Sequence, residues 1–239
     1  MAVMTWSIVA RDRSGAFGIA IASKFFAVGA LCPAIRTGTG ALSTQALMNP
    51  LYARDGLALL DAGHSAVEAI ERITAADAGR ESRQVHAVDA HGRTSAHTGS
   101  NCIEWCGHLA GEGFSIAGNM LAGPQVIAQT ARAYREAAAL PFGLRLIAAL
   151  KAGEDAGGDK RGKQSAALLV HTTEDYPALS LRVDDHAEPI DELKRLYTVS
   201  LERFQPFVSC LASRARPAGI TDRAAIEAEI ARFHAAAER

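Results

Sequence analysis

Short segments in which hydrophobic and polar residues alternate begin near the start of the chain. Residues 5–10 read TWSIVA, and side chains at alternate positions of such a segment face two different surroundings, as in a β-strand. The turn-forming residues 11–15 lead into a second apolar run, FGIAIAS, at residues 17–23. The two runs predict a β-hairpin with Thr5 at its beginning.

The same patterns recur along the rest of the chain. We expect strands at residues 5–10, 17–23, 40–45, 84–89, 93–98, 113–118, 164–170 and 178–183. We expect helices at about residues 51–62, 65–75, 124–139, 142–152, 188–213 and 222–237. Ser65 and Glu68 have the spacing of a capping box, and the helix that follows should turn Val67, Ile70 and Ile73 inward.

The order of these elements predicts an α+β fold. Strands and helices occur in groups and do not alternate one by one, which argues against a parallel doubly wound sheet. Two mostly antiparallel sheets covered by helix pairs fit the order, in a four-layer αββα sandwich. We expect one domain over residues 1–213 and a peripheral helical tail over residues 214–239.

Composition narrows the class of protein. The chain has 239 residues, 49% hydrophobic, and a formal net charge of −1, which gives no electrostatic footprint for nucleic acid or an anionic membrane. The four cysteines have no disulfide-framework spacing, and the most apolar stretch, residues 17–35, has Lys24 at its centre. We therefore expect a cytoplasmic protein that acts on a small molecule.

Thr5 is the first candidate for chemistry. It follows a methionine, so a start at Met4 or a cut after it would give Thr5 a free α-amino group. A free amine has a pKa of about 8 and can serve as the base that activates the hydroxyl of the same residue. The alternative is an ordinary β-branched residue at the beginning of a strand.

Several blocks of the sequence together resemble the DUF1028 family, which is grouped with the N-terminal-nucleophile (Ntn) hydrolases. The blocks are Thr5–Ala10, Ser23–Gly29, Gly40 with Thr44 and Gln45, Arg83 and Gln84, Ala96–Gly99, Gly118–Gly123, Gly157–Gly162 with Gln164 and Ser165, and Leu181–His186. The resemblance covers about residues 4–200 and implies the αββα fold and an amide hydrolase. In the family a methionine usually begins the chain directly before this Thr, whereas here Met1–Met4 precede it.

The resemblance and the residue chemistry together suggest a site around Thr5. Asn119 could donate to an oxyanion, and Asp159 could orient Arg161, whose planar fork suits a substrate carboxylate. The expected catalytic residues are Thr5, Asn119, Lys24 and Ser23, and the expected substrate-binding residues are Thr44, Gln45, Arg83, His97, Asp159, Arg161 and Gln164. Lys24 and His97 could tune the pKa of the Thr5 amine, and the alternative is a structural role for each.

Metal and phosphate chemistry receive less support from the sequence. Cys102, Cys106 and His108 lack the second ligand pair of a zinc site, and residues 184–186 (DDH) are more typical of a helix cap or an ion pair than of a cation site. Residues 157–164 are not a phosphate-binding P-loop, because their spacing differs and a strand follows. We expect no cofactor and no bound metal.

The expected activity is hydrolysis of a small amide or related C–N bond. Two alternatives remain open: a non-catalytic ligand-binding or assembly protein on the same fold, and a hydrolase whose nucleophile is internal, with Ser23, Thr44 or Ser165 as candidates. The apolar stripe of residues 188–213 favours a homodimer, unless that stripe merely covers the chain's own sheet.

Overall fold

The computed structural model describes residues 5–237, and the chain divides into two compact units. The first unit extends to Lys194 and the second begins at Arg195. The division falls inside helix α5 (Pro189–Glu202), whereas the sequence placed a boundary near residue 214.

The first unit contains two antiparallel sheets. The larger has six strands in the order β10-β9-β2-β1-β8-β7, and the smaller has four in the order β3-β4-β5-β6. The strands of the larger sheet are β1 (Thr5–Arg11), β2 (Phe17–Ser23), β7 (Gly107–Gly111), β8 (Phe114–Asn119), β9 (Ser165–His171) and β10 (Leu179–Val183). Those of the smaller sheet are β3 (Pro33–Arg36), β4 (Gly40–Ala46), β5 (Arg83–Asp89) and β6 (Thr94–Thr98). The α+β class and the antiparallel pairing agree with the prediction.

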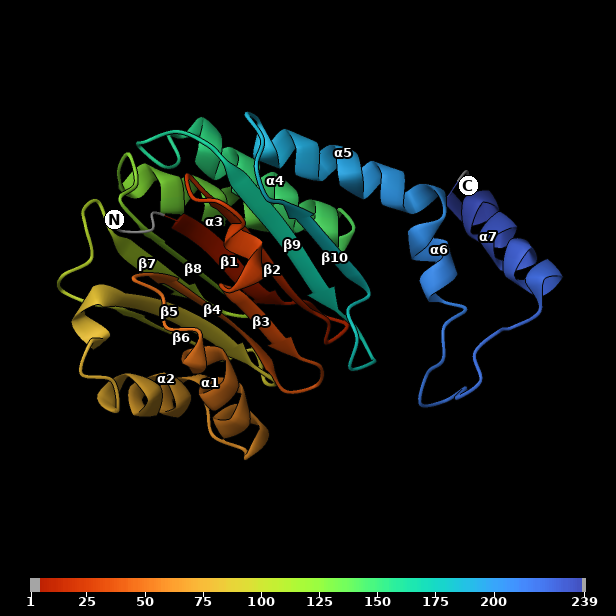
Figure 1. Cartoon of the computed structure of the whole chain (residues 1–239), viewed down its shortest axis with the longest axis horizontal. Coiled ribbons are helices and arrows are strands. Elements are labelled where there is room, and N and C mark those ends of the chain that lie inside the picture. Colours follow the sequence, from red (N-terminus) through yellow and green to blue (C-terminus); the bar gives the residue numbers. More distant parts are fainter. Residues whose placement is uncertain (1–4, 238–239) are drawn as a thin grey trace. The chain divides into compact units, whose positions relative to one another are not determined.

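Strand β1 lies at the centre of the larger sheet, between β2 and β8, and faces β4 and β5 of the smaller sheet (Figure 1). The space between the sheets changes character along β1. Near its end, Val9 packs with Phe17, Ile19, Ala41 and Val88 in an apolar cluster. At its beginning, the interior positions are polar.

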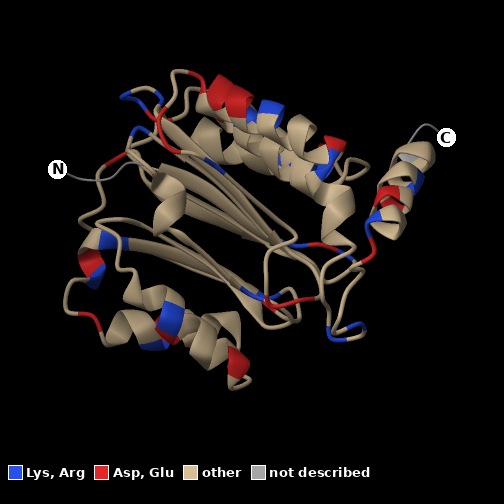
Figure 2. Ribbon diagram, turned by 45° about the vertical axis from the view of Figure 1, so that its right-hand side comes forward, with Lys and Arg blue, Asp and Glu red and all other residues tan. Residues whose placement is uncertain are grey.

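Helices pack on the outer side of each sheet (Figure 1). Helices α1 (Leu51–Asp61) and α2 (Ala66–Ala75) contact the smaller sheet, while α3 (Pro124–Glu136) and α4 (Phe142–Asp155) contact the larger one. Basic and acidic residues are interspersed along the helices visible in Figure 2. Two short 3₁₀ turns, η1 (Val28–Ala30) and η2 (Arg80–Ser82), complete the first unit.

Strands β3 and β7 were not expected from the sequence. Both are short edge strands, for which periodicity gives little signal. β3 begins at a proline, which cannot donate to a ladder but is tolerated at the first position of an edge strand. β7 begins and ends at glycine, which favours turns in a sequence-based interpretation.

The helix expected over residues 188–213 is interrupted. Helix α5 ends at Glu202, Arg203 has φ −147°, and a short helix α6 (Phe204–Val208) follows. Pro206 explains the interruption, because it has no N–H to donate to the carbonyl of Glu202. The last helix is α7 (Arg223–Ala237).

Helix α2 has the predicted capping box but a different inner face. The Ser65 hydroxyl accepts from the Glu68 N–H, and the Glu68 carboxylate accepts from the Ser65 N–H. Ile70 is 3% exposed, but Val67 is 45% exposed, so its assignment to the inner face was wrong. The buried residues of α2 are Ala66, Ala69, Ile70, Ile73 and Thr74, so two alanines and a threonine belong to the inner face.

The two positions on α2 provide a matched test of the packing. Ile70→Ala should lower the free energy of unfolding by about 2–5 kcal/mol, because it leaves a cavity against Leu42 and Val85. Val67→Ala should change it by less than about 0.5 kcal/mol, since the side chain is largely solvated. Urea unfolding of the two variants measures both values, and equal losses would contradict the assigned helix face.

Candidate functional site

A row of polar side chains crosses the larger sheet at the end where Thr5 lies. Ser165, Ser23, Thr5 and Asn119 occupy neighbouring strands and pair in register, Ser23 with Ser165 and Thr5 with Asn119. The Thr5 hydroxyl donates to the Ser23 hydroxyl over 3.2 Å. All four residues are buried, and the row places a possible nucleophile beside a possible oxyanion donor.

Two glutamines of the smaller sheet face this row. Gln45 of β4 donates through Nε2 to the Thr5 carbonyl oxygen at 3.4 Å and to Gln84 Oε1 at 2.7 Å. Asn119 Nδ2 donates to the same Gln84 oxygen at 3.1 Å. Gln84 therefore connects the smaller sheet to both residues of the Thr5–Asn119 pair.

The orientation of the Gln84 amide follows from its surroundings. Its Nε2 lies 2.9 Å from Thr98 Oγ1, 3.1 Å from the Gly107 carbonyl and 2.9 Å from the Gly118 carbonyl. A nitrogen that faces three oxygen atoms must be the donor, so Oε1 faces Gln45 and Asn119 as acceptor.

The network extends along β1 from Gln45 to a buried histidine. Ser7 donates to Gln45 Oε1 at 2.7 Å, so its lone pair accepts from His86 Nε2 at 2.8 Å. The other ring nitrogen, Nδ1, lies 3.1 Å from the Ser115 hydroxyl and accepts from it. Burial, with a smaller effect of His108, lowers the pKa of His86 to about 3, so the ring is neutral.

The loop over residues 157–164 closes against the same end of the larger sheet. Asp159 accepts from the Lys24 N–H at 2.8 Å and pairs with the Arg161 guanidinium at 3.1 Å. The Gln164 N–H donates to the Ser23 carbonyl at 3.1 Å. Glycines at 157, 158 and 162 all have positive φ, which lets the loop turn tightly enough to make these contacts.

Four of the expected residues do not face Thr5. Lys24 directs its ammonium to the Lys163 carbonyl at 3.0 Å, and only its N–H lies at Asp159. Thr44, Arg83 and His97 occupy the other face of the smaller sheet, because their neighbours Gln45, Gln84 and Thr98 face inward and side chains alternate along a strand. Arg83 pairs with Asp77, and His97 contacts the Arg80 carbonyl.

Two of the proposed internal nucleophiles already have structural hydrogen bonds. Ser165 donates to the Phe25 carbonyl and accepts from the Val28 N–H at 3.2 Å. Thr44 accepts from the Asn49 N–H at 3.2 Å on the helix side of the sheet. Ser23, which accepts from Thr5, is the internal candidate that the fold places at the site.

The residues considered as metal ligands make other contacts. The Cys102 thiol donates to the Arg83 carbonyl, the Cys106 thiol to the Cys102 carbonyl, and His108 Nδ1 lies 2.9 Å from Thr98 Oγ1. Burial raises the pKa of Cys102 to about 11, which disfavours the thiolate that a metal requires. His186 accepts from the Glu188 N–H at the start of α5, as a helix cap does.

Ser7, Gln84, His86 and Ser115 are the polar residues that sequence reasoning missed. Each lies within a strand that the sequence predicts, at residues 5–10, 84–89 or 113–118. The signal that could have found them is polar side chains at the interior positions of otherwise apolar strands.

A small cavity of about 90 Å³ lies beside Ser23 and Asp159. Trp6 and Glu154 also line it, and both the Trp6 Nε1 and the Glu154 Oε1 are buried without a hydrogen-bond partner in the described part of the chain. The other carboxylate oxygen of Glu154 pairs with Lys151 at 2.7 Å and Lys163 at 3.2 Å. The Trp6 Nε1 and the Glu154 Oε1 are both fully buried: the Trp6 Nε1 lies against Gly153 and Thr130, while the carbon edge of the Trp6 ring faces Gly158 in the cavity wall.

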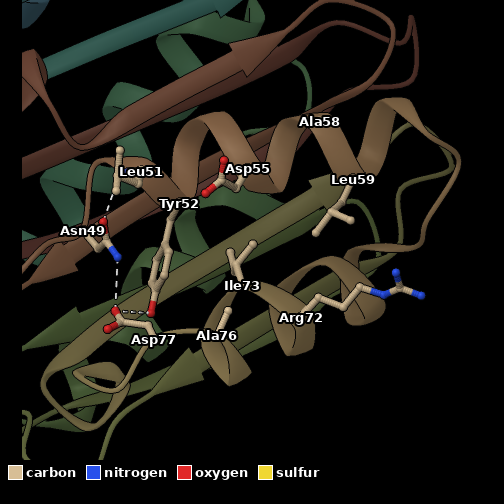
Figure 3. A pocket seen from close by; sticks show the side chains of 10 residues that line it. All are labelled: Asn49, Leu51, Tyr52, Asp55, Ala58, Leu59, Arg72, Ile73, Ala76 and Asp77. Carbon is tan, nitrogen blue, oxygen red and sulfur yellow. Dashed lines mark hydrogen bonds between the residues drawn. The ribbon is translucent and has the colours of Figure 1, made fainter.

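A larger hollow of about 530 Å³ lies between α1 and α2, on the outer side of the smaller sheet (Figure 3). Its polar end is Asp77, which accepts from the Tyr52 hydroxyl at 2.8 Å and the Asn49 amide at 3.1 Å. Burial alone would raise the pKa of Asp77, but these hydrogen bonds, with those from Gly79 and Arg83, lower it to about 2. Asp77 is therefore a structural anchor between the helices and β5.

Comparison with known proteins agrees with this arrangement of strands and helices. Residues 5–193 match the family of unknown function DUF1028, and the chain belongs to that family. The crystal structure of protein SPO2555 from Silicibacter pomeroyi, of the same family, is 31% identical, with a TM-score of 0.85 over 92% of this chain and 96% of that one.

Other comparisons add little. Anbu (ancestral beta-subunit) from Yersinia bercovieri is 10% identical, with a TM-score of 0.39 over 82% of this chain and 94% of that one, a likeness too slight to support an argument. No curated protein matches the sequence.

The buried His86 should make stability depend on pH. The unfolded chain takes up a proton near pH 6.5, whereas folded His86 does so only near pH 3. Between these values the unfolded state binds more protons, so the free energy of unfolding should fall on acidification by up to about 1.4 kcal/mol per pH unit.

Urea unfolding between pH 7 and pH 4.5 measures this slope. His86→Gln should be less stable at pH 7 but lose less stability on acidification than the unmodified chain. His91→Gln, at an exposed position in the turn between β5 and β6, is the control and should leave the slope unchanged. Equal slopes in His86→Gln and the unmodified chain would assign the titration to another group.

Proposed function

We propose that this protein is a hydrolase of a small amide or related C–N bond, with Thr5 as its nucleophile. The observation that supports the proposal is the position of Thr5 at the beginning of a central strand, with Ser23 and Asn119 beside it on the interior face. We also propose that the two sheets and their outer helices form the four-layer αββα sandwich of the Ntn hydrolases. The family match, the antiparallel sheets and the helices on each outer face support that assignment.

The chemistry requires a free α-amino group on Thr5, which cleavage after Met4 would provide. The amine takes the hydroxyl proton as Oγ1 attacks the substrate carbonyl, and the C–O bond forms while the carbonyl electrons become an oxyanion. The protonated amine then gives its proton to the leaving nitrogen as the C–N bond breaks. Water, deprotonated by the same amine, hydrolyses the ester on Thr5.

Asn119 is proposed as the oxyanion donor. Gln84 Oε1 accepts one N–H of its amide, which leaves the second N–H for the oxyanion within the described part of the chain. Preorganised donors of this kind contribute more than any other single group in many acyl-transfer enzymes. Gln45, which holds the Thr5 carbonyl, is a positioning residue in this scheme.

Arg161 is proposed to hold the substrate. Asp159 accepts from Nε and Nη2 of Arg161, so Nη1 is the nitrogen left to bind a substrate carboxylate. A small amide that carries a carboxylate fits this group.

One observation favours a competing function. Thr5 is completely buried, so a non-catalytic protein that binds a ligand or partner through other surfaces is also consistent with the fold. Of the apolar stripe expected over residues 188–213, Ile190, Leu193 and Tyr197 are buried within the chain, whereas Val199, Phe204 and Phe207 are exposed. We propose that these exposed residues support a homodimer in either case, and light scattering that returns a particle of about 25 kDa would contradict that assembly. None of the described helices has both the length and the apolar character to cross a membrane.

A chain that begins at Thr5 tests the nucleophile without knowledge of the substrate. A peptide epoxyketone forms a ring only with a residue that presents both a hydroxyl and a free α-amine. We expect one probe per chain by intact mass, and no adduct in Thr5→Ala. Asn119→Ala should slow labelling by roughly 10²–10³, because the attacked ketone also becomes an oxyanion.

A chain whose mass shows that Met4 is retained is the matched control, since its Thr5 hydroxyl has no free amine beside it. It should not form the ring. Equal labelling of Thr5→Ala would contradict the assignment of Thr5 as the nucleophile. A folded chain beginning at Thr5 that forms no adduct would favour the binding protein.

A further inference from the structure

A second hollow, of about 580 Å³, lies at the other end of β1 from Thr5. Six residues of extended strand separate Thr5 from Arg11, roughly 20 Å. Four arginines line the hollow: Arg11 and Arg13 from the end of β1 and its turn, Arg135 from α3, and Arg145 from α4. This arginine hollow brings together three segments of the chain and has no part in the chemistry proposed for Thr5.

These four guanidinium groups have no acidic partners. Within residues 5–237, none of them lies within 4.0 Å of a carboxylate, whereas Arg36, Arg83 and Arg161 are each paired with an aspartate. Basic and acidic residues are otherwise mixed over the helices (Figure 2). Like charges gathered without counter-charges repel one another, so the arrangement is favourable only when an anion joins it.

The acidic residues at the hollow do not neutralise it. Asp12 directs one carboxylate oxygen into its own turn, where it accepts from the Ser14 N–H, the Ser14 hydroxyl and the Ala16 N–H. Glu112 is exposed, and no ion pair joins it to the arginines within the described residues. The lining therefore keeps an excess of two positive charges, in a protein whose net charge is −1.

Two of the guanidinium groups are held in place by aromatic rings. The Arg145 Cζ lies 3.7 Å from the centre of the Tyr134 ring, and the Arg135 Cζ lies 5.0 Å from the centre of Phe114. The two rings pack on each other at 4.9 Å, and Arg145 Nε donates to the Tyr134 carbonyl. Stacking of this kind orients a guanidinium before any ligand arrives and reduces the entropy lost on binding.

Arg11 is only partly satisfied by the protein itself. Its Nε is buried and has no hydrogen-bond partner in the described part of the chain, and its Nη1 makes only a long contact of 3.5 Å with the Asp12 carbonyl. The charge of this guanidinium therefore remains without a strong acceptor.

We propose that the arginine hollow binds a small molecule with at least two oxyanion groups. Guanidinium forks match phosphate and carboxylate oxygens equally in geometry, and the four forks surround a volume that holds a small organic ligand. The site is separate from Thr5, and its existence does not depend on the proposed hydrolase activity.

Isothermal titration of the full chain with pyrophosphate and, separately, with citrate tests the site. We expect one-to-one binding of at least one probe at low ionic strength, which weakens as salt is added. Tighter binding of pyrophosphate assigns a phosphate ligand, and tighter binding of citrate assigns a polycarboxylate. Absence of binding by both at about 10 mM overturns the proposal, because millimolar affinity is the weakest that a built site provides.

Matched variants on one helix separate the hollow from the general surface. Arg135→Gln and Arg13→Gln should each weaken binding about tenfold or more, as expected for loss of one charge-assisted contact. Arg132→Gln, on the same helix but paired with Glu136, should leave the affinity within about twofold. Equal weakening by Arg132→Gln would show that the anion binds to overall charge and would overturn the site.

Discussion

The hydrogen bonds between the two sheets at the Thr5 end are the interaction on which the rest of the structure depends. Polar side chains buried there must find partners, since each unsatisfied group costs about 1–3 kcal/mol. Ser7, Gln45 and Gln84 satisfy one another only in the observed register. A slip of β1 by one residue would bring Trp6 between the sheets and turn Thr5 toward the helices.

Much of the fold could be predicted from periodicity, because the long strands and helices bury one regular face. The short edge strands β3 and β7 and the interruption at Arg203 depend on pairing and on single prolines or glycines, which periodicity does not detect. The site was harder to predict than the fold. The sequence could name Thr5, Ser23, Asn119 and Gln45. It also named Arg83, although the neighbouring residue Gln84 is the one that faces inward. That choice depends on which face of the smaller sheet is covered by helices, and tertiary packing alone decides it.

The two ends of β1 differ in how they treat polar groups. At Thr5, neutral amides and hydroxyls satisfy one another in a closed interior, and His86 is held neutral among them. At Arg11, four arginines line a hollow, and no carboxylate of the described residues pairs with them. One central strand thus positions a neutral and a charged environment, and the apolar cluster around Val9 separates them.

The direction of the hydrogen bonds at Gln84 also bears on chemical ageing. Because its nitrogen faces three oxygens, deamidation to glutamate would set a carboxylate oxygen against the Thr98 hydroxyl and two main-chain carbonyls. The contacts with the Gly107 and Gly118 carbonyls would become repulsive, although the retained Oε1 could still accept from Gln45 and Asn119. Deamidation requires water, and the complete burial of Gln84 keeps water away from its amide. The same packing that makes the residue irreplaceable therefore also protects it over the lifetime of the molecule.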